Sequence, residues 1–235
     1  MPAEQGDPAT FVDSHGKGQA APGSGERKPV RMKLLWSSRS PFVRKVLIVM
    51  HELGIAADVD LWRVVVSSAR VNAEVMALSP LGRIPALVLE DGSVLHDSRV
   101  IAEYLDSRHG NGTLFPPGVL RWQALRQQAL ADGIMETDIR WLEERDRPEA
   151  MRAVSRIEAY RAKIESALDV FETDQALDAT ELPTIGHLAA ASALAHLDFR
   201  FNELSWRSGR PRLAAWYEAV SRRPAVRATA FSDQY

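Results

Sequence analysis

Apolar residues in the first half of the chain change from strand-like to helix-like spacing and back again. A short apolar segment covers residues 34–37, helical spacing follows over 42–53, and near alternation follows over 55–65. Ser40 can cap the intervening helix, and Pro41 suits its first position. These segments predict a strand, a helix and a second strand, which is the beginning of a βαβ unit.

The next segments complete a small α/β domain. The expected elements are, in order, a weak helix at 69–78 and short strands at 86–89 and 93–95. Asp91-Gly92 lies between these two strands and is a strong hairpin signal. Ser98 can cap the helix that follows. The resulting order predicts a mixed sheet covered by helices.

The segment "HGNGTLFPPG" at residues 109–118 interrupts this pattern. It contains three glycines and two prolines, so no helix or strand can continue through it. We therefore expect a linker at 109–119 between a domain at 32–108 and a second domain at 120–235. The strong periodic segments of the second domain are all helical, at 120–144, 149–172, 184–198 and 211–221. The predicted fold class is α/β plus all-α, ending in a helical bundle.

Residues 1–31 show no hydrophobic period and are rich in Gly, Pro, Ala and charged residues. They also lack the apolar core of a secretory signal. We predict a disordered tail, which either an over-long gene model or a vector-derived extension would explain. Met32 then begins the first apolar strand.

Charge and composition exclude several classes of function. The 29 basic and 31 acidic residues nearly cancel and the basic ones are scattered, so we expect no nucleic-acid partner. The chain has no cysteine, which excludes disulfides and a nucleophilic thiol of the protein itself. Its histidines are isolated in sequence, and its apolar runs are too short to span a membrane. We predict a cytoplasmic protein without a metal and without a membrane partner.

Three stretches resemble the glutathione S-transferase superfamily. "SRSPFVRKVLIVMHELGI" and "LSPLGRIPALVLEDGSVLHDSRVIAEYLD" resemble its N-terminal half, and "PTIGHLAAASALAHLDFRF" resembles a helix of its C-terminal domain. The form "SPFVRK" is most similar to bacterial serine-type members. The resemblance implies an N-terminal thioredoxin-like domain, glutathione as cosubstrate, a small electrophilic substrate and a homodimer.

The resemblance also implies where glutathione binds. Ile84-Pro85 matches the family's cis-proline, which leaves the Ile84 backbone free to pair with the cysteinyl unit. The alternative is a trans-proline that starts an edge strand. Asp97-Ser98 matches the pair that holds the γ-glutamyl end, beside the positive N-terminal end of a helix. The alternative there is that Ser98 only caps its helix.

Ser40 is the candidate catalytic residue, because the family places a serine or cysteine just before the first helix. A hydroxyl that donates a hydrogen bond to sulfur favours the thiolate, and a thiol with a pKa of ~8.5 is mostly protonated at neutral pH. Ser37 and Ser38 compete for this role, and Ser40 as a plain N-cap is the remaining alternative. The expected chemistry is attack of the thiolate on an electrophilic carbon.

Two alternatives to a transferase are a glutathione-dependent isomerase similar to the zeta-class maleylacetoacetate isomerases and a non-catalytic binding protein. The electrophile itself does not follow from the sequence. Its pocket is expected to involve Arg39, Phe42, the surroundings of Met135 and residues 231–235. One position departs from the family, because His187 stands three residues after Thr184 where an Asp completes a capping box. We expect His187 to replace that carboxylate poorly.

Overall fold

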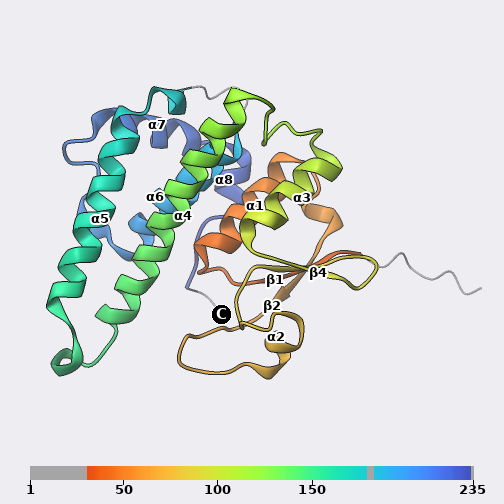
Figure 1. Ribbon diagram of the computed structural model, residues 1–235, viewed down its shortest axis with the longest axis horizontal. Coiled ribbons are helices and arrows are strands. Elements are labelled where there is room, and N and C mark those ends of the chain that lie inside the picture. Colours follow the sequence, from red (N-terminus) through yellow and green to blue (C-terminus); the bar gives the residue numbers. More distant parts are fainter. Residues whose placement is uncertain (1–30, 179–182, 234–235) are drawn as a thin grey trace, which may run out of the picture. The chain divides into compact units, whose positions relative to one another are not determined.

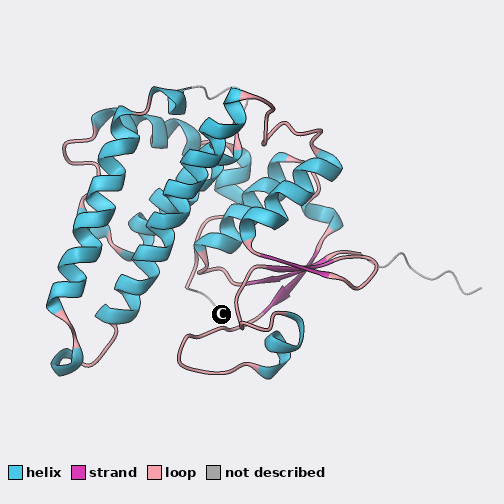
Figure 2. Ribbon diagram, viewed as in Figure 1, coloured by secondary structure: helices cyan, strands magenta, loops and turns pink. Residues whose placement is uncertain are grey.

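The N-terminal strands pair into one four-stranded sheet of order β2-β1-β3-β4 (Figure 2). The computed structural model describes residues 31–178 and 183–233, and most of the expected tail, residues 1–30, lies outside them. The strands are β1 (Lys33–Trp36), β2 (Asp60–Arg63), β3 (Ala86–Val88) and β4 (Val94–His96). β1 runs parallel to β2 and antiparallel to β3, and β3 runs antiparallel to β4. This is the mixed sheet that the sequence predicts.

Helices cover both faces of this sheet. The three helices are α1 (Pro41–Glu52), α2 (Ala73–Leu78) and α3 (Ser98–His109). Figure 1 shows α1 and α3 together on one face and α2 on the other. Successive strand residues point to opposite faces. Accordingly Leu34 packs in the cluster that contains Ile101 of α3, and Leu35 packs in the cluster that contains Val75 of α2.

Two N-terminal elements are shorter than the sequence pattern predicts. The expected strand at 55–65 begins instead with a 3-10 turn, η1 (Ala56–Asp58), so that only β2 is extended. The expected helix at 69–78 begins only after Asn72, whose side chain caps it by accepting from the N–H of Val75 at 3.2 Å. Local turns and a polar cap therefore override the apolar spacing.

The rest of the described chain is helical. It contains α4 (Val119–Arg145), η2 (Glu149–Met151), α5 (Val154–Thr173), η3 (Gln175–Asp178), α6 (Ile185–Arg200), η4 (Asn202–Leu204), α7 (Pro211–Ser221) and α8 (Pro224–Ala228). Every residue at 185–197 in α6 is buried, which makes α6 the centre of the bundle. A Cβ on Gly186 would lie 2.8 Å from the carbonyl oxygen of Ala124, so α4 and α6 approach closely because this position has no side chain.

The capping box of α6 forms despite the departure from the family. The backbone N–H of Thr184 donates to Nδ1 of His187 at 3.0 Å, and Nε2 of the same ring lies 3.2 Å from the carbonyl oxygen of Ala176. A proton on Nε2 satisfies both contacts. Burial lowers the pKa of His187, which favours this neutral ring. The expectation that His187 replaces a carboxylate poorly is therefore wrong.

Helix α1 connects the sheet to the helical bundle. It packs against α3, α6 and α8. The hydroxyl of Ser192 in α6 donates to the carbonyl oxygen of Pro41 at 2.8 Å, which ties the beginning of α1 to the buried central helix. Within residues 31–178 and 183–233, no helix is long and apolar enough to cross a membrane.

Candidate functional site

Sheet register brings the predicted site segments to one end of the sheet. Leu35 near the end of β1 is paired with Ala86 at the start of β3, and Ala86 is paired with His96 at the end of β4. The chain therefore leaves β1, enters β3 and leaves β4 at the same end of the sheet. The candidate residues on these connections are Ser40 after β1, Ile84 and Pro85 before β3, and Asp97 and Ser98 after β4.

Ser40 is the N-cap of α1. Its Oγ accepts a hydrogen bond from the backbone N–H of Val43 at 3.3 Å, and the side chain is half-buried. Among the residues that the structure describes, this hydroxyl has no hydrogen-bond acceptor. Because its oxygen is used as the cap and its proton is not, Ser40 can act as a helix cap and a hydrogen-bond donor together.

The two competing serines are engaged differently. Ser38 donates its hydroxyl to the carbonyl oxygen of Ser232 at 2.8 Å. Ser37 accepts from the backbone N–H of Arg39 at 3.3 Å. The proton of Ser38 is therefore committed to the C-terminal segment. Ser37, like Ser40, accepts locally and has no acceptor for its proton among the described residues, but it is not the N-cap of α1.

The Ile84-Pro85 bond is cis, as expected from the resemblance. Neither the backbone N–H nor the carbonyl oxygen of Ile84 forms a hydrogen bond with the described part of the chain. A buried backbone without internal partners needs an external one. Since Ile84 directly precedes β3 at this end of the sheet, an extended ligand can pair with its backbone there.

Asp97, rather than Ser98, caps α3. Its Oδ1 accepts from the backbone N–H of Arg99 at 2.8 Å, whereas Ser98 is the first helical residue and is 3% exposed. The expectation that Ser98 is the cap is therefore wrong by one residue. Asp97 adopts φ 70° and ψ 130°, a conformation that costs an L-residue ~1–3 kcal/mol. Strain of this kind is concentrated at functional positions, which draws attention to Asp97.

A buried ion pair joins α1, the helix that Ser40 caps, to α4. Lys45 of α1 places Nζ 2.6 Å from Oδ1 of Asp132 in α4, and Arg99 of α3 lies 3.3 Å from the other carboxylate oxygen. Burial lowers the pKa of Lys45 and raises the pKa of Asp132. These contacts connect α1 and α3 to the bundle, and the sequence pattern did not predict them.

The C-terminal segment runs beside the loop that contains Ser40. The backbone N–H of Ser232 donates to the carbonyl oxygen of Ser38 at 3.2 Å. Arg44 of α1 is 5% exposed and donates through Nε to the carbonyl oxygen of Thr229 at 2.8 Å. Burial lowers the pKa of Arg44 to about 10. A buried cation of α1 therefore anchors the segment next to the candidate catalytic serine.

The residues expected at the electrophile pocket lie in different surroundings. Arg39 and Phe231 lie on this face, where Phe231 stacks on Phe199 with ring centroids 5.2 Å apart. Met135 itself is completely buried in the helical core, and the place of the residues around it in the pocket stays a prediction. The last two residues of the expected segment, 234–235, lie outside the described residues.

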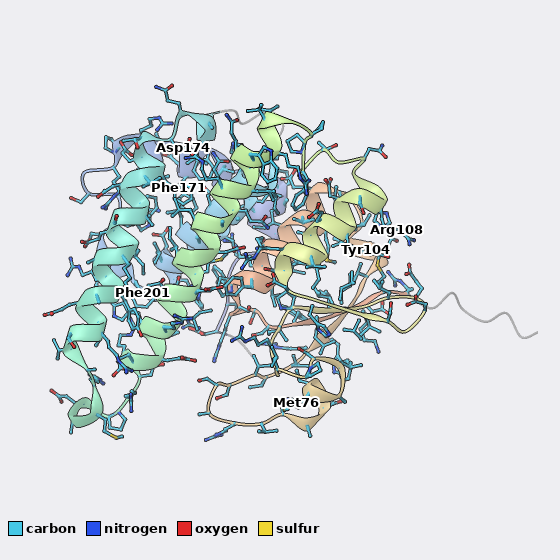
Figure 3. All side chains as sticks on the ribbon, viewed as in Figure 1. Met76, Tyr104, Arg108, Phe171, Asp174 and Phe201 are labelled. Carbon is cyan, nitrogen blue, oxygen red and sulfur yellow. The ribbon has the colours of Figure 1, made fainter. Side chains whose placement is uncertain are left out.

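A separate hollow of about 400 Å³ lies between α4 and α5. Figure 3 shows two of its lining residues, Phe171 and Asp174, at one end of α5. None of the five predicted site residues lines it. It therefore contributes nothing to the arrangement around Ser40. In the ranges that the structure describes, three or more potential ligands of the His, Cys, Asp or Glu type do not gather into a metal site.

Comparisons with known proteins match both halves of the chain. Residues 39–108 match the family "Glutathione S-transferase, N-terminal domain", and residues 154–219 match "Glutathione S-transferase, C-terminal domain". The chain is 33% identical over 204 residues to the uncharacterised GST-like protein YibF of Escherichia coli K12, covering 84% of this chain and 98% of the relative.

Two solved structures extend this likeness. A glutathione transferase family member from Pseudomonas fluorescens Pf-5, with bound glutathione, is 39% identical, with a TM-score of 0.81 and coverage of 86% of this chain and 99% of that one. A second structure from that organism, with bound S-(propanoic acid)-glutathione, is 38% identical, with a TM-score of 0.78 and coverage of 86% and 100%. The chain belongs to the glutathione S-transferase family, with a thioredoxin-like N-terminal domain and a helical C-terminal domain.

Proposed function

We propose that this protein is a serine-type glutathione transferase in which Ser40 activates the glutathione thiol. The observation that carries the proposal is the hydrogen bonding of Ser40. Its Oγ accepts from the N–H of Val43, and its proton has no acceptor among the described residues. A hydroxyl in this state can donate to a sulfur placed at the beginning of α1.

The energy required for activation is within reach of this geometry. Lowering a thiol pKa by ~2 units requires ~2.7 kcal/mol of preferential interaction with the thiolate. A hydrogen bond to a charged group contributes ~1.5–3 kcal/mol, and the N-terminal end of a helix adds ~0.3–1 kcal/mol. The hydroxyl of Ser40 and the N-terminus of α1 together supply interactions of that size.

We assign glutathione binding to the other candidate residues at the same end of the sheet. Ile84 offers the cysteinyl unit a backbone N–H and carbonyl oxygen that have no partner among the described residues, directly before Pro85. Asp97 is half-exposed, so it can accept from the ammonium group of the γ-glutamyl unit. Ser98 begins α3, where free N–H groups favour the γ-glutamyl carboxylate. The glutathione-bound relative supports the choice of ligand.

We further propose that the protein is a cytoplasmic homodimer. Apolar side chains on the outer faces of α3 and α4 support an interface there. Val100 is 51% exposed and Trp122 is 70% exposed. Tyr104 and Arg108 lie together on α3, with the guanidinium carbon 5.8 Å from the ring centroid (Figure 3). Aromatic residues and arginine are enriched at protein interfaces.

The proposed function is tested by two measurements on the purified full chain. The first is retention on immobilised glutathione, and the second is turnover of a general aryl halide with glutathione. Binding together with turnover supports a transferase. Binding without turnover across several electrophiles contradicts it and favours a binding protein, and turnover of a cis-enone diacid without conjugation favours an isomerase.

A further inference from the structure

Two arginines from distant parts of the chain hold one carboxylate beside the proposed thiol site. Arg39 places Nε 3.0 Å from Oδ1 of Asp233. Arg200 donates through Nη1 and Nη2 to the two carboxylate oxygens of Asp233, at 3.1 and 2.8 Å. The fork of Arg200 therefore fits a planar carboxylate with two parallel hydrogen bonds.

Arg200 is held in place before any ligand arrives. It is the last residue of α6, and its side chain is only 18% exposed. Its guanidinium carbon lies 3.9 Å from the ring centroid of Phe199. Because stacking and burial restrict the side chain, little rotamer freedom remains to be lost when a carboxylate binds.

This pair of arginines adjoins the reacting position. Arg39 immediately precedes Ser40 in the loop after β1. Asp233 follows Ser232, whose backbone is bonded to Ser38 in the same loop. The ring of Phe199 lies against Arg200 and stacks on Phe231, and the two rings provide an apolar surface. A cationic fork, an apolar surface and the serine loop thus occupy one face.

The side chain of Asp233 can be displaced from the two arginines. Asp233 is 55% exposed, and the described residues after α8 contain no helix or strand. Arg39, which is 36% exposed on its side chain, is also reachable from solvent. Exposed ion pairs are weak, so a carboxylate on a ligand that is already held by its glutathione part can compete with Asp233.

We propose that Arg39 and Arg200 form a carboxylate-binding subsite, so that the preferred electrophiles carry a carboxylate near the reactive carbon. In the free protein the side chain of Asp233 occupies this subsite. The inference rests on the proposed function, because it concerns the substrate of the same site. In a representative reaction with 4-chloro-3-nitrobenzoate, the thiolate sulfur forms a bond to the ring carbon para to the carboxylate. The carbon–chlorine bond breaks, chloride leaves with the electron pair, and the thiol proton passes to solvent.

The direct test is a binding comparison that needs no turnover. S-(2-carboxyethyl)glutathione and S-(2-carbamoylethyl)glutathione have nearly the same shape and differ in one charge. Calorimetric titration of the full chain is expected to give about tenfold tighter binding of the acid, because bonds to charged groups are the stronger ones. Equal affinities for the two conjugates would overturn the proposal.

Substitutions assign the preference to the two arginines. Arg39→Gln and Arg200→Gln should each reduce the acid-to-amide ratio by at least about threefold, with glutathione affinity unchanged. Arg161→Gln is the matched control, because it removes one arginine charge from an exposed ion pair on α5. Arg39 lies in a partly exposed loop, so its variant retains the fold even if Arg200→Gln does not. A ratio unchanged in Arg39→Gln would overturn the proposal.

Asp233→Asn separates a ligand subsite from a mere anchor of the C-terminal segment. Removing the competing charge should tighten binding of the acid by about two- to fivefold and leave the amide unchanged. Weaker binding of the acid would show that the arginines serve only to anchor the C-terminal segment.

The turnover of 4-chloro-3-nitrobenzoate, compared with that of its benzamide and each divided by its uncatalysed rate, provides the kinetic counterpart. A protein that fails to bind glutathione contradicts the proposed function, whereas one that binds glutathione without an acid preference contradicts this inference alone.

Discussion

Lys45 of α1 and Asp132 of α4 form an ion pair with Nζ 2.6 Å from Oδ1, and their side chains are 0% and 2% exposed. The pair joins α1, which Ser40 caps, to the longest described helix of the bundle. Removing two charges from water is costly, and the attraction between them offsets that cost only while both are present. The pair therefore links the two domains more by mutual dependence than by net stabilisation.

This dependence predicts the outcome of a double-mutant cycle. Asp132→Leu should lower the free energy of unfolding by ~3–5 kcal/mol, because it leaves Lys45 buried without its carboxylate partner. Lys45→Met should lower it by less, because Arg99 still lies 3.3 Å from Asp132. The double variant should lose much less than the sum. Urea unfolding of all four proteins measures the coupling, and additive losses would contradict the account. Arg99 is half-exposed, so it can turn to solvent in the double variant.

The neutral ring of His187 predicts a pH effect on stability. Its pKa is lowered by burial, so in the window just below ~6.5 the unfolded chain binds a proton that the folded chain does not. The contribution of His187 to the free energy of unfolding is complete above pH ~6.5 and is lost as the pH falls below that value. Between pH 7.5 and 5.5 the wild type should lose up to ~1.4 kcal/mol more than His187→Gln, whose amide can keep the capping bond without titrating. Identical losses in urea unfolding would show that His187 does not titrate in this way.

Asp97 combines a strained backbone with a proposed role in glutathione binding, and two substitutions separate the two effects. Asp97→Ala and Asp97→Gly both remove the carboxylate and should weaken glutathione binding by about tenfold or more. Asp97→Gly should nevertheless be more stable than Asp97→Ala by ~1 kcal/mol, because glycine tolerates positive φ. Thermal unfolding and calorimetric titration measure the two effects. An alanine variant as stable as the glycine variant would exclude backbone strain at this position.

Local sequence signals predicted the elements that local interactions determine. Ser40 followed by Pro41 marks the start of α1 correctly, and the glycine- and proline-rich segment falls between α3 and α4. The family resemblance, and not the spacing of residues, predicted the cis bond before Pro85. Sheet register then explains why the candidate site residues lie at one end of the sheet, since the end of β1 is paired with the start of β3, and the start of β3 with the end of β4.

The features that the sequence did not predict depend on contacts between distant residues. Lys45 reads as a polar interruption of an apolar helix face, and only the fold brings Asp132 to it. Arg44 reads as a solvated arginine near a helix start, yet the C-terminal segment buries it. His187 succeeds as a cap because the carbonyl oxygen of Ala176 selects the required tautomer. In each case the decisive partner is specified by tertiary structure.

The pKa of the bound glutathione thiol decides whether the hydroxyl of Ser40 activates it. Ultraviolet absorbance of the thiolate, followed against pH in the complex, gives this pKa for the wild type and for Ser40→Ala, Ser38→Ala and Ser37→Ala. We expect a wild-type value about two units below the ordinary ~8.5. We also expect a return toward that value in Ser40→Ala alone, with turnover at neutral pH reduced roughly ten- to thousandfold and glutathione affinity little changed. A normal pKa in Ser38→Ala with a lowered one in Ser40→Ala would place activation two residues earlier, and a pKa unaffected by all three substitutions would contradict activation by a serine hydroxyl.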